Sequence, residues 1–144
     1  MILPDVNVLV YAYRLESAFH DDYAAWLTSV VQGADDLALV EPVLVGFVRI
    51  VTNGRVWTDP APTTHAIEFV DAMRRGRRLR WLPTTNATWQ RFSAIAGADP
   101  HVRGNLVPDA WLAAQALAHG CPLATADRGF ARFEGLDWFD PVAL

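Results

Sequence analysis

Apolar positions along the chain fall into short uncharged runs that alternate with longer segments of helical spacing. Short apolar runs bounded by polar or turn residues are typical of buried strands, whereas apolar residues three and four apart predict amphipathic helices. Strands that alternate with helices favour an α/β domain whose sheet is mostly parallel. The pattern predicts strands over residues 2–5, 37–40, 79–82 and 122–125, and it allows a fifth over 136–139.

Helical spacing fills most of the chain between these strands. Most of the predicted helices carry an end signal, such as Pro in the first turn or Gly after the last. The helix before the third strand is expected to begin at a Thr63 or Thr64 cap and to direct Ile67, Val70 and Met73 inward. The expected helices cover residues 6–14, 21–31, 43–52, 64–75, 86–96 and 108–118, and a polar loop covers 97–106.

The composition describes one globular domain that spans residues 1–144. Of the 144 residues 52% are hydrophobic and 19% are charged, so the chain can bury one sizeable core. Its apolar stretches are too short to span a bilayer, and no basic segment precedes the N-terminal apolar run as it would in a signal peptide. The single cysteine, Cys121, has no partner for an internal disulfide, which fits a reducing compartment. We therefore expect a cytoplasmic protein without a membrane segment.

The charge of the chain argues against general affinity for nucleic acids but leaves a local basic patch open. The formal net charge is −4, and all 12 of the basic Lys and Arg residues are Arg. Five of them lie within residues 74–80. That cluster fits a phosphate-binding patch on an otherwise acidic protein, and it fits equally a solvated loop between a helix and a strand.

Carboxylates in apolar surroundings are the clearest chemical signal of the chain. Asp5 stands among apolar residues, and a buried carboxylate costs free energy unless a positive charge or a metal ion pairs with it. Glu41 and Asp127 follow the second and fourth predicted strands, and Asp109 lies in the first turn of the helix before the fourth strand. Strand C-termini and helix N-termini share one edge of a parallel sheet, so all these acids are expected to meet there.

Such a group of oxygen ligands fits a hard divalent cation, Mg²⁺ or Mn²⁺. The histidines and the single cysteine are too scattered along the sequence for a zinc site. A cation held by carboxylates commonly serves phosphoryl chemistry, because it activates water and neutralises charge on a phosphate. A structural role stays open for each acid, since Asp109 and Glu41 are also favourable charges at helix N-termini and Asp127 is also a common turn residue.

With these residues in view, the chain resembles the PIN-domain ribonucleases, and in particular the VapC-type toxins of bacterial toxin–antitoxin pairs. The matching segments run in the order of that family from one end of the chain to the other. They are residues 3–9 (Leu-Pro-Asp-Val-Asn-Val-Leu), 46–53 (Gly-Phe-Val-Arg-Ile-Val-Thr-Asn), 102–110 (Val-Arg-Gly-Asn-Leu-Val-Pro-Asp-Ala) and 124–130 (Ala-Thr-Ala-Asp-Arg-Gly-Phe).

The resemblance implies a PIN-like fold and cleavage of RNA that depends on Mg²⁺ or Mn²⁺. It assigns the first, third and fourth acids of the family to Asp5, Asp109 and Asp127, as metal ligands and catalytic residues. Many relatives carry the second acid near the position of Gly46, so Glu41, about one helical turn earlier, is expected to take its place. The resemblance also implies structured RNA such as tRNA or rRNA as the substrate, a VapB-type antitoxin as a partner, and a homodimer.

Further residues near the acids are expected to assist them. Asn7 can hydrogen-bond Asp5 or a metal-bound water, and it can equally cap the first helix. Thr125 matches a small hydroxyl residue that the family places two positions before its last acid. Contacts with RNA are expected from Arg49, Arg103 and Asn105.

The aromatic residues have two interpretations. Trp57 and Trp81 can stack on RNA bases, although packing in the core is the commoner use of tryptophan. Tyr11, Tyr23 and Trp26 can form a dimer surface or belong to the core.

Other functions compete with that of a ribonuclease. A phosphohydrolase of the haloacid-dehalogenase type normally has a second acid two residues after its first, where this chain has Asn7. A DNA or flap nuclease on the same fold normally carries additional arches, for which the chain is short. A PIN-like module that binds RNA or protein without catalysis is favoured by Gly46 and opposed by the intact Asp5, Asp109 and Asp127. Metal binding separates the last alternative from an enzyme.

Overall fold

The computed structural model describes residues 1–143 as an α/β fold in which every ladder of strands is parallel. Short strands alternate with helices of up to 13 residues. The elements, in chain order, are β1 (Leu3–Pro4), α1 (Val6–Tyr13), α2 (His20–Gln32), β2 (Leu37–Leu39), α3 (Glu41–Val51), α4 (Thr63–Arg74), β3 (Leu79–Trp81), α5 (Asn86–Ala98), the 3₁₀ turn η1 (Gly104–Leu106), α6 (Val107–His119), β4 (Leu123–Ala124), the 3₁₀ turn η2 (Arg128–Arg132) and β5 (Trp138–Phe139).

The strands lie in the order β3-β2-β1-β4-β5, with the first strand of the chain in the middle. β2 pairs with β3, β1 pairs with β4, and β4 pairs with β5. A single parallel bridge between Ile2 and Leu37 joins the two groups. The α/β class and the mostly parallel sheet predicted from the sequence are therefore confirmed.

The strand register brings the ends of three neighbouring strands together. Pro4 pairs with Ala124, and Ala124 pairs with Phe139. The next residues along these strands are Asp5, Thr125 and Asp140. Because neighbouring strands are about 4.8 Å apart, these side chains emerge side by side at the carboxyl edge of the sheet.

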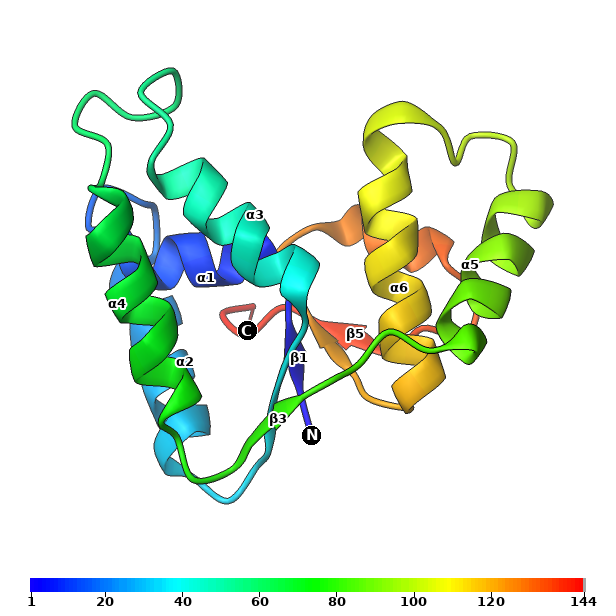
Figure 1. Cartoon of the computed structure of the whole chain (residues 1–144), viewed down its shortest axis with the longest axis horizontal. Helices are drawn as coiled ribbons and strands as arrows, with labels where there is room; N and C mark the ends of the chain where they lie inside the picture. The colour runs from blue at the N-terminus through cyan, green and yellow to red at the C-terminus, as the bar shows by residue number, and fades with distance from the viewer. Residues whose placement is uncertain (144) are drawn as a thin grey trace.

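Helices cover both sides of the strands. In Figure 1, α2 and α4 stand on one side of the strands, while α5 and α6 stand on the other. α1 packs against α2 and α3, α3 packs against α4, and α5 packs against α6. Within residues 1–143 no helix combines the length and the apolar character needed to cross a membrane.

An aromatic group joins α1, α3 and α4. Phe47 is fully buried, and its ring centroid lies 5.4 Å from that of Tyr13 and 5.2 Å from that of Phe69. Tyr13 and Phe69 also contact each other, with centroids 5.0 Å apart. Aromatic contacts of this kind add to the area that the rings bury, so the group fixes how the three helices meet.

Two predictions for α4 are wrong, namely the cap at its N-terminus and one of the residues that face the core. The helix begins at Thr63 after Pro62, and no side chain caps its N-terminus. Ile67 is 47% exposed, and the adjacent Ala66 is buried in its place. The reason is the packing of Phe69 on the aromatic group, which turns the helix so that Ala66, Val70 and Met73 face the core.

Other sequence expectations are corrected or decided by the packing. Residues 97 and 98 belong to α5, and the expected loop contains the 3₁₀ turn at Gly104–Leu106. Trp81 lies on the edge strand β3 and is 44% exposed, with the Arg74 guanidinium 5.5 Å from its ring centroid. Tyr23 is buried, and Tyr11 and Trp26 pack against the same core, so the core interpretation of these aromatics holds.

The aromatic group predicts a large loss of stability for Phe47→Ala. Removal of a fully buried phenyl ring leaves a cavity, so the free energy of unfolding should fall by about 3–5 kcal/mol. Val45→Ala is the matched control on the same helix, because Val45 is 68% exposed and its removal should change stability by less than about 0.5 kcal/mol. Urea denaturation of both variants checks this, and equal losses would show that Phe47 is not part of a tightly packed core.

Candidate active site

Asp5 occupies the junction between β1 and α1. Its backbone N–H donates to the Ala124 carbonyl oxygen at 2.9 Å, which continues the pairing of β1 with β4 by one residue. Its side chain caps α1, because Oδ1 accepts from the Val6 backbone N–H at 2.7 Å. Only 6% of Asp5 is exposed. The sequence therefore places a nearly buried carboxylate at the carboxyl end of the central strand.

Thr125 connects Asp5 to the chain around Asp127. The Thr125 hydroxyl donates to Asp5 Oδ2 at 2.8 Å and accepts from the Asp127 backbone N–H at 3.0 Å. Thr125 is fully buried, so its hydroxyl has no alternative partner in solvent. Both carboxylate oxygens of Asp5 thus accept hydrogen bonds. The Thr125 hydroxyl links Asp5 to the backbone of Asp127, the last acid.

Asp127 begins the turn η2 and is exposed. Its Oδ1 accepts from the Gly129 backbone N–H at 2.7 Å. A Cβ atom at Gly129 would stand 2.9 Å from that same oxygen, so glycine keeps the turn closed. The turn interpretation of Asp127 is therefore correct as geometry, and the bond from Gly129 holds its carboxylate at the start of η2. The role of Gly129 was not anticipated, although Asp-x-Gly is a common turn sequence.

Asp109 lies in the first turn of α6 and is half-buried. Burial is the main cause that raises its pKa to about 6, and the charges of Asp5 and Asp127 raise it further. Burial also raises the pKa of Asp5, the hydrogen bonds from Thr125 and Val6 oppose this rise, and the charge of Asp127 adds to it. The three carboxylates are therefore close enough to repel one another, and none of them forms an ion pair within residues 1–143.

The donor chemistry of this group fits a divalent cation, although the side chains as they stand do not form a closed cage. Among residues 1–143 no set of three or more His, Cys, Asp or Glu side chains is arranged to hold a metal ion directly. Mg²⁺ commonly keeps several waters and uses one or two carboxylates, so it does not require such a cage. Asp5, Asp109 and Asp127 repel one another, and unpaired acids gathered in a half-buried place lack the positive charge that would stabilise them.

Glu41 lies at the same edge but apart from these three acids. It is the first residue of α3, directly after β2, and its side chain is exposed. It is not among the charges that raise the pKa of Asp5 or Asp109. At Gly46 a Cβ atom would stand 3.3 Å from Val6 Cγ2, so the missing side chain lets α3 approach α1 beside Asp5.

The remaining predicted site residues are exposed around the acids. Asn7 lies in the first turn of α1, and Arg49 lies in the last turn of α3. Arg103 and Asn105 belong to the segment around η1, which leads directly into α6 and Asp109. Their exposure leaves them free to contact a ligand that approaches this edge.

The cluster of Arg residues at 74–80 lies at the other end of the strands, where α4 finishes and β3 begins. Arg78 and Arg80 both pair with Asp36, at 2.7 Å and 3.0 Å. Arg74 pairs with Asp71 and lies over the ring of Trp81. Much of this cluster is thus engaged within the chain, away from the carboxylates.

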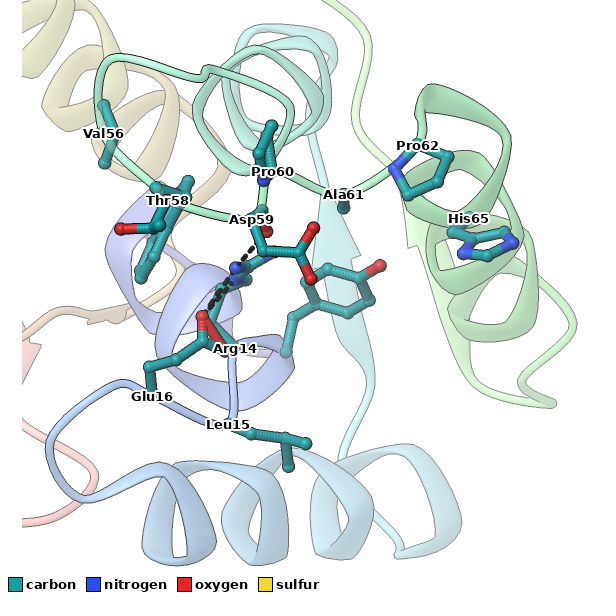
Figure 2. Close-up of a pocket in the computed structure, with 12 residues that line it drawn as sticks. Arg14, Leu15, Glu16, Val56, Thr58, Asp59, Pro60, Ala61, Pro62 and His65 are labelled. Carbon is teal, nitrogen blue, oxygen red and sulfur yellow. Dashed lines mark hydrogen bonds and ion pairs between the residues drawn. The ribbon is translucent and has the colours of Figure 1, made fainter.

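A cavity of about 860 Å³ is lined by residues other than the carboxylates. Figure 2 shows it between the end of α1 and the segment that links α3 to α4. There the buried Arg14 binds Glu16, donates to the Asp59 carbonyl oxygen at 2.7 Å and lies 4.4 Å from the Trp57 ring centroid. Arg14 thus holds the segment that links α3 to α4 in place, and its polar groups are engaged within the chain. The cavity is therefore a structural feature, and the carboxylates are the better candidate for an active site.

Comparison with known proteins identifies the family and the fold of the chain. The PIN domain family model matches residues 2–136. The VapC ribonuclease Mb2897 of Mycobacterium bovis is 40% identical over 142 residues, which cover 99% of this chain and 96% of the relative. Ribonuclease VapC33 of Mycobacterium tuberculosis is 33% identical and covers 99% of each chain. The crystal structure of VapBC2 from Rickettsia felis, bound to a DNA fragment from their promoter, contains a similar chain with a TM-score of 0.72, 19% identity, and coverage of 97% and 98%.

The raised pKa of Asp109 predicts a distinct pH dependence of stability. A pKa of about 6, against an ordinary 3.8, means that the folded protein binds the proton more tightly than the unfolded chain. The contribution of Asp109 to stability should therefore be most favourable below about pH 4, fall as the pH rises to about 6, and stay low at neutral pH. Asp109→Asn removes this dependence and should stabilise the metal-free protein at about pH 7.

Thermal melts in EDTA at about pH 4.5 and about pH 7 measure the effect for wild type and Asp109→Asn. Asp35→Asn serves as the control, because Asp35 is an exposed carboxylate in the α2–β2 loop. If wild type and Asp109→Asn lose the same stability between the two pH values, Asp109 is not destabilised by its neighbours.

Proposed function

This chain belongs to the PIN domain family, and within it to the VapC ribonucleases, and from that premise we propose that it is a metal-dependent endoribonuclease acting as the toxin of a VapBC-type pair. The observation that carries the proposal is the group formed by Asp5, Asp109 and Asp127. They come from the start, the late middle and the end of the sequence, yet they act on one another's pKa values.

The cofactor in this proposal is Mg²⁺, with Mn²⁺ as an alternative, held by Asp5, Asp109 and Asp127. When bound, it would neutralise charge on the phosphate and make a bound water more acidic. Thr125 and the Val6 N–H fix Asp5, and the Gly129 N–H fixes Asp127, so two carboxylates are oriented before any ligand arrives.

Asp109 differs from the other two acids because its side chain accepts no hydrogen bond within residues 1–143. It therefore keeps its proton-accepting oxygens free. In our proposal a carboxylate of this group accepts a proton from the water that attacks the scissile phosphate, and Asp109 is the best placed to do so. Glu41, exposed at the start of α3, is assigned a supporting role at the rim of the site.

RNA would approach this edge over the exposed Arg103, Asn105 and Arg49. Arginine contacts with phosphates make binding fall steeply with salt concentration. Substrates of this kind are cleaved in loops or single-stranded segments, where the backbone is accessible and the bases are free of partners. We accordingly propose structured RNA, such as tRNA or rRNA, with the cut in an unpaired stretch.

The proposed protein partner is a VapB-type antitoxin that covers the acidic edge and keeps RNA away from it. The support is the fold shared with a chain of the VapBC2 complex and the identity with VapC proteins. A homodimer is also proposed, but its surface cannot rest on Tyr23, which is buried and bonded to Asp140.

One observation favours an alternative, a PIN module that binds RNA or protein without catalysis. The α3 position that faces Val6 holds Gly46, where the resemblance to the family leads us to expect an acid. A binding module has no need of a divalent cation, whereas the enzyme proposed here does. Dependence of RNA cleavage on metal therefore separates the two.

The proposal predicts discrete cleavage of a mixed tRNA and rRNA pool in Mg²⁺ and none in EDTA. Asp109→Asn should lower the rate at least about 100-fold, the scale of loss when one group that stabilises charge in a transition state is removed. The fold should survive, because the Asp109 side chain has no hydrogen bond to lose within residues 1–143. Gel analysis of the fragments provides the measurement.

Asp5→Asn and Asp35→Asn complete the experiment. Asp5→Asn should also abolish cleavage, and Asp35→Asn should cleave like wild type because it changes an exposed carboxylate outside the site. Cleavage that persists in EDTA, or in both Asp109→Asn and Asp5→Asn, would contradict the proposed function. Bound but uncut RNA in every condition would favour the binding module.

A further inference from the structure

A second cavity, of about 470 Å³, lies directly beside the candidate active site. Ala126, which lines it, is the residue between Thr125 and Asp127. Asp140 also lines it and follows β5 at the position next to Thr125 in the strand register. The cavity therefore opens at the same carboxyl edge as the acids, within one residue of Asp127 along the chain. Its volume lies in the range of small-molecule sites.

Three aromatic side chains line it. Tyr11 comes from α1, Phe19 from the segment before α2, and Tyr23 from α2 itself. The ring centroids of Tyr11 and Tyr23 are 5.2 Å apart at an interplanar angle of 52°. The last segment of the chain, after β5, lies near α1 in Figure 1, and its residues Val142 and Ala143 line the cavity together with Tyr11 of α1.

Phe19 has an unusual conformation for its residue type. Its φ is +58°, and it is the one residue other than glycine with a positive φ in the part of the chain that the structure describes. Its side chain is 68% exposed, so burial in the core does not explain why a phenyl ring is placed there. A bulky residue held in this backbone region is strained, and such strain commonly occurs where a ligand is clamped.

Asp140 supplies a single acidic group in the cavity. Its Oδ1 accepts from the Tyr23 hydroxyl at 3.0 Å and from the Val142 backbone N–H at 3.0 Å. Burial and the bond to Asp140 raise the pKa of Tyr23 well above its ordinary value, so the hydroxyl remains a donor. Both of these bonds go to one oxygen, which leaves Oδ2 to accept from a ligand.

We propose that this cavity, lined by Tyr11, Phe19, Tyr23, Ala126 and Asp140, binds a nucleobase that carries an exocyclic amine, in a nucleotide next to the scissile phosphate. The Phe19 and Tyr11 rings stack on the face of the base, as aromatic rings do in proteins that bind single-stranded nucleic acids. The carboxylate accepts from the amine, which is the way an acidic side chain reads cytosine. Uracil presents a carbonyl oxygen at the same position and is repelled. The inference rests on the proposed ribonuclease function for its biological meaning.

Cytidine and uridine 5′-monophosphate test the cavity without any cleavage, because the bases differ by that amine. NMR titration of the Asp109→Asn protein with each nucleotide should show binding of the cytidine form that is at least about tenfold tighter. Asp140→Asn should abolish the difference, since the amide keeps an oxygen for Tyr23 and puts an NH₂ group where the free oxygen was. Phe19→Asn should weaken both nucleotides without loss of stability, because Asn tolerates a positive φ.

Sequencing of the cut sites in a randomised single-stranded RNA, with active protein, tests the same cavity in the reaction. Wild type should show a preference for amine-bearing bases at one fixed position relative to the cut, and this preference should fall at least about tenfold in Asp140→Asn. Phe19→Asn should slow cleavage and leave the preference unchanged, because stacking on the ring does not distinguish the bases. Trp89→Asn is the control, because Trp89 is 57% exposed and packs against Phe92 and Trp111, away from the cavity.

The outcomes distinguish the base-binding cavity from the proposed ribonuclease function. Cleavage whose base preference is the same in wild type and Asp140→Asn overturns the pocket and leaves the ribonuclease standing. Cytidine binding that depends on Asp140, without any cleavage, supports the pocket and overturns the ribonuclease. Equal or absent binding of the two nucleotides overturns the pocket whatever the cleavage result.

Discussion

The hydrogen bond from Thr125 to Asp5 is the interaction on which the arrangement of the site depends. It joins the residues that follow two paired strands, and the same hydroxyl accepts from the backbone of Asp127. Asp5 is nearly buried, so without donors its carboxylate would be costly to keep inside the protein. The bond to Thr125 and the cap on α1 offset part of that cost, and they fix Asp5 relative to the start of α1 and the end of β4. The other carboxylates take their positions from the same strand and helix ends.

The charges at this edge are not balanced by the protein itself. The Arg residues that pair with acids do so elsewhere, at Glu16, Asp36, Asp71 and Asp99. Asp109 and Asp5 instead hold their protons more tightly than usual, since burial and neighbouring negative charge act in the same direction. A fold that tolerates this repulsion has free energy to gain from a cation. In the proposed function, that cation serves the hydrolysis of phosphodiesters. The aromatic cavity beside the acids would then select which nucleotide lies at the cut.

The sequence was sufficient to predict those residues of the site whose positions follow from the direction of the strands and helices. Strand C-termini and helix N-termini share one edge of a parallel sheet, so Asp5, Asp109 and Asp127 could be expected to meet although they are distant in sequence. Features set by packing between distant segments could not be expected in the same way. Helical spacing alone does not distinguish Ala66 from Ile67 as the buried residue of α4, because the contact of Phe69 with Tyr13 and Phe47 decides it. The cavity that contains Asp140 draws its wall from several segments, and none of them carries a recognisable motif.

The most direct test of this account is the thermal stability of the purified chain during titration with Mg²⁺ or Mn²⁺, for wild type and Asp109→Asn. A cation that binds the folded protein and not the unfolded chain raises the melting temperature with its concentration. The account predicts a progressive rise for wild type and a much smaller one for Asp109→Asn, which lacks one of the repelling charges. No rise in wild type, or an equal rise in both proteins, would show that the carboxylates at this edge do not bind a metal ion together.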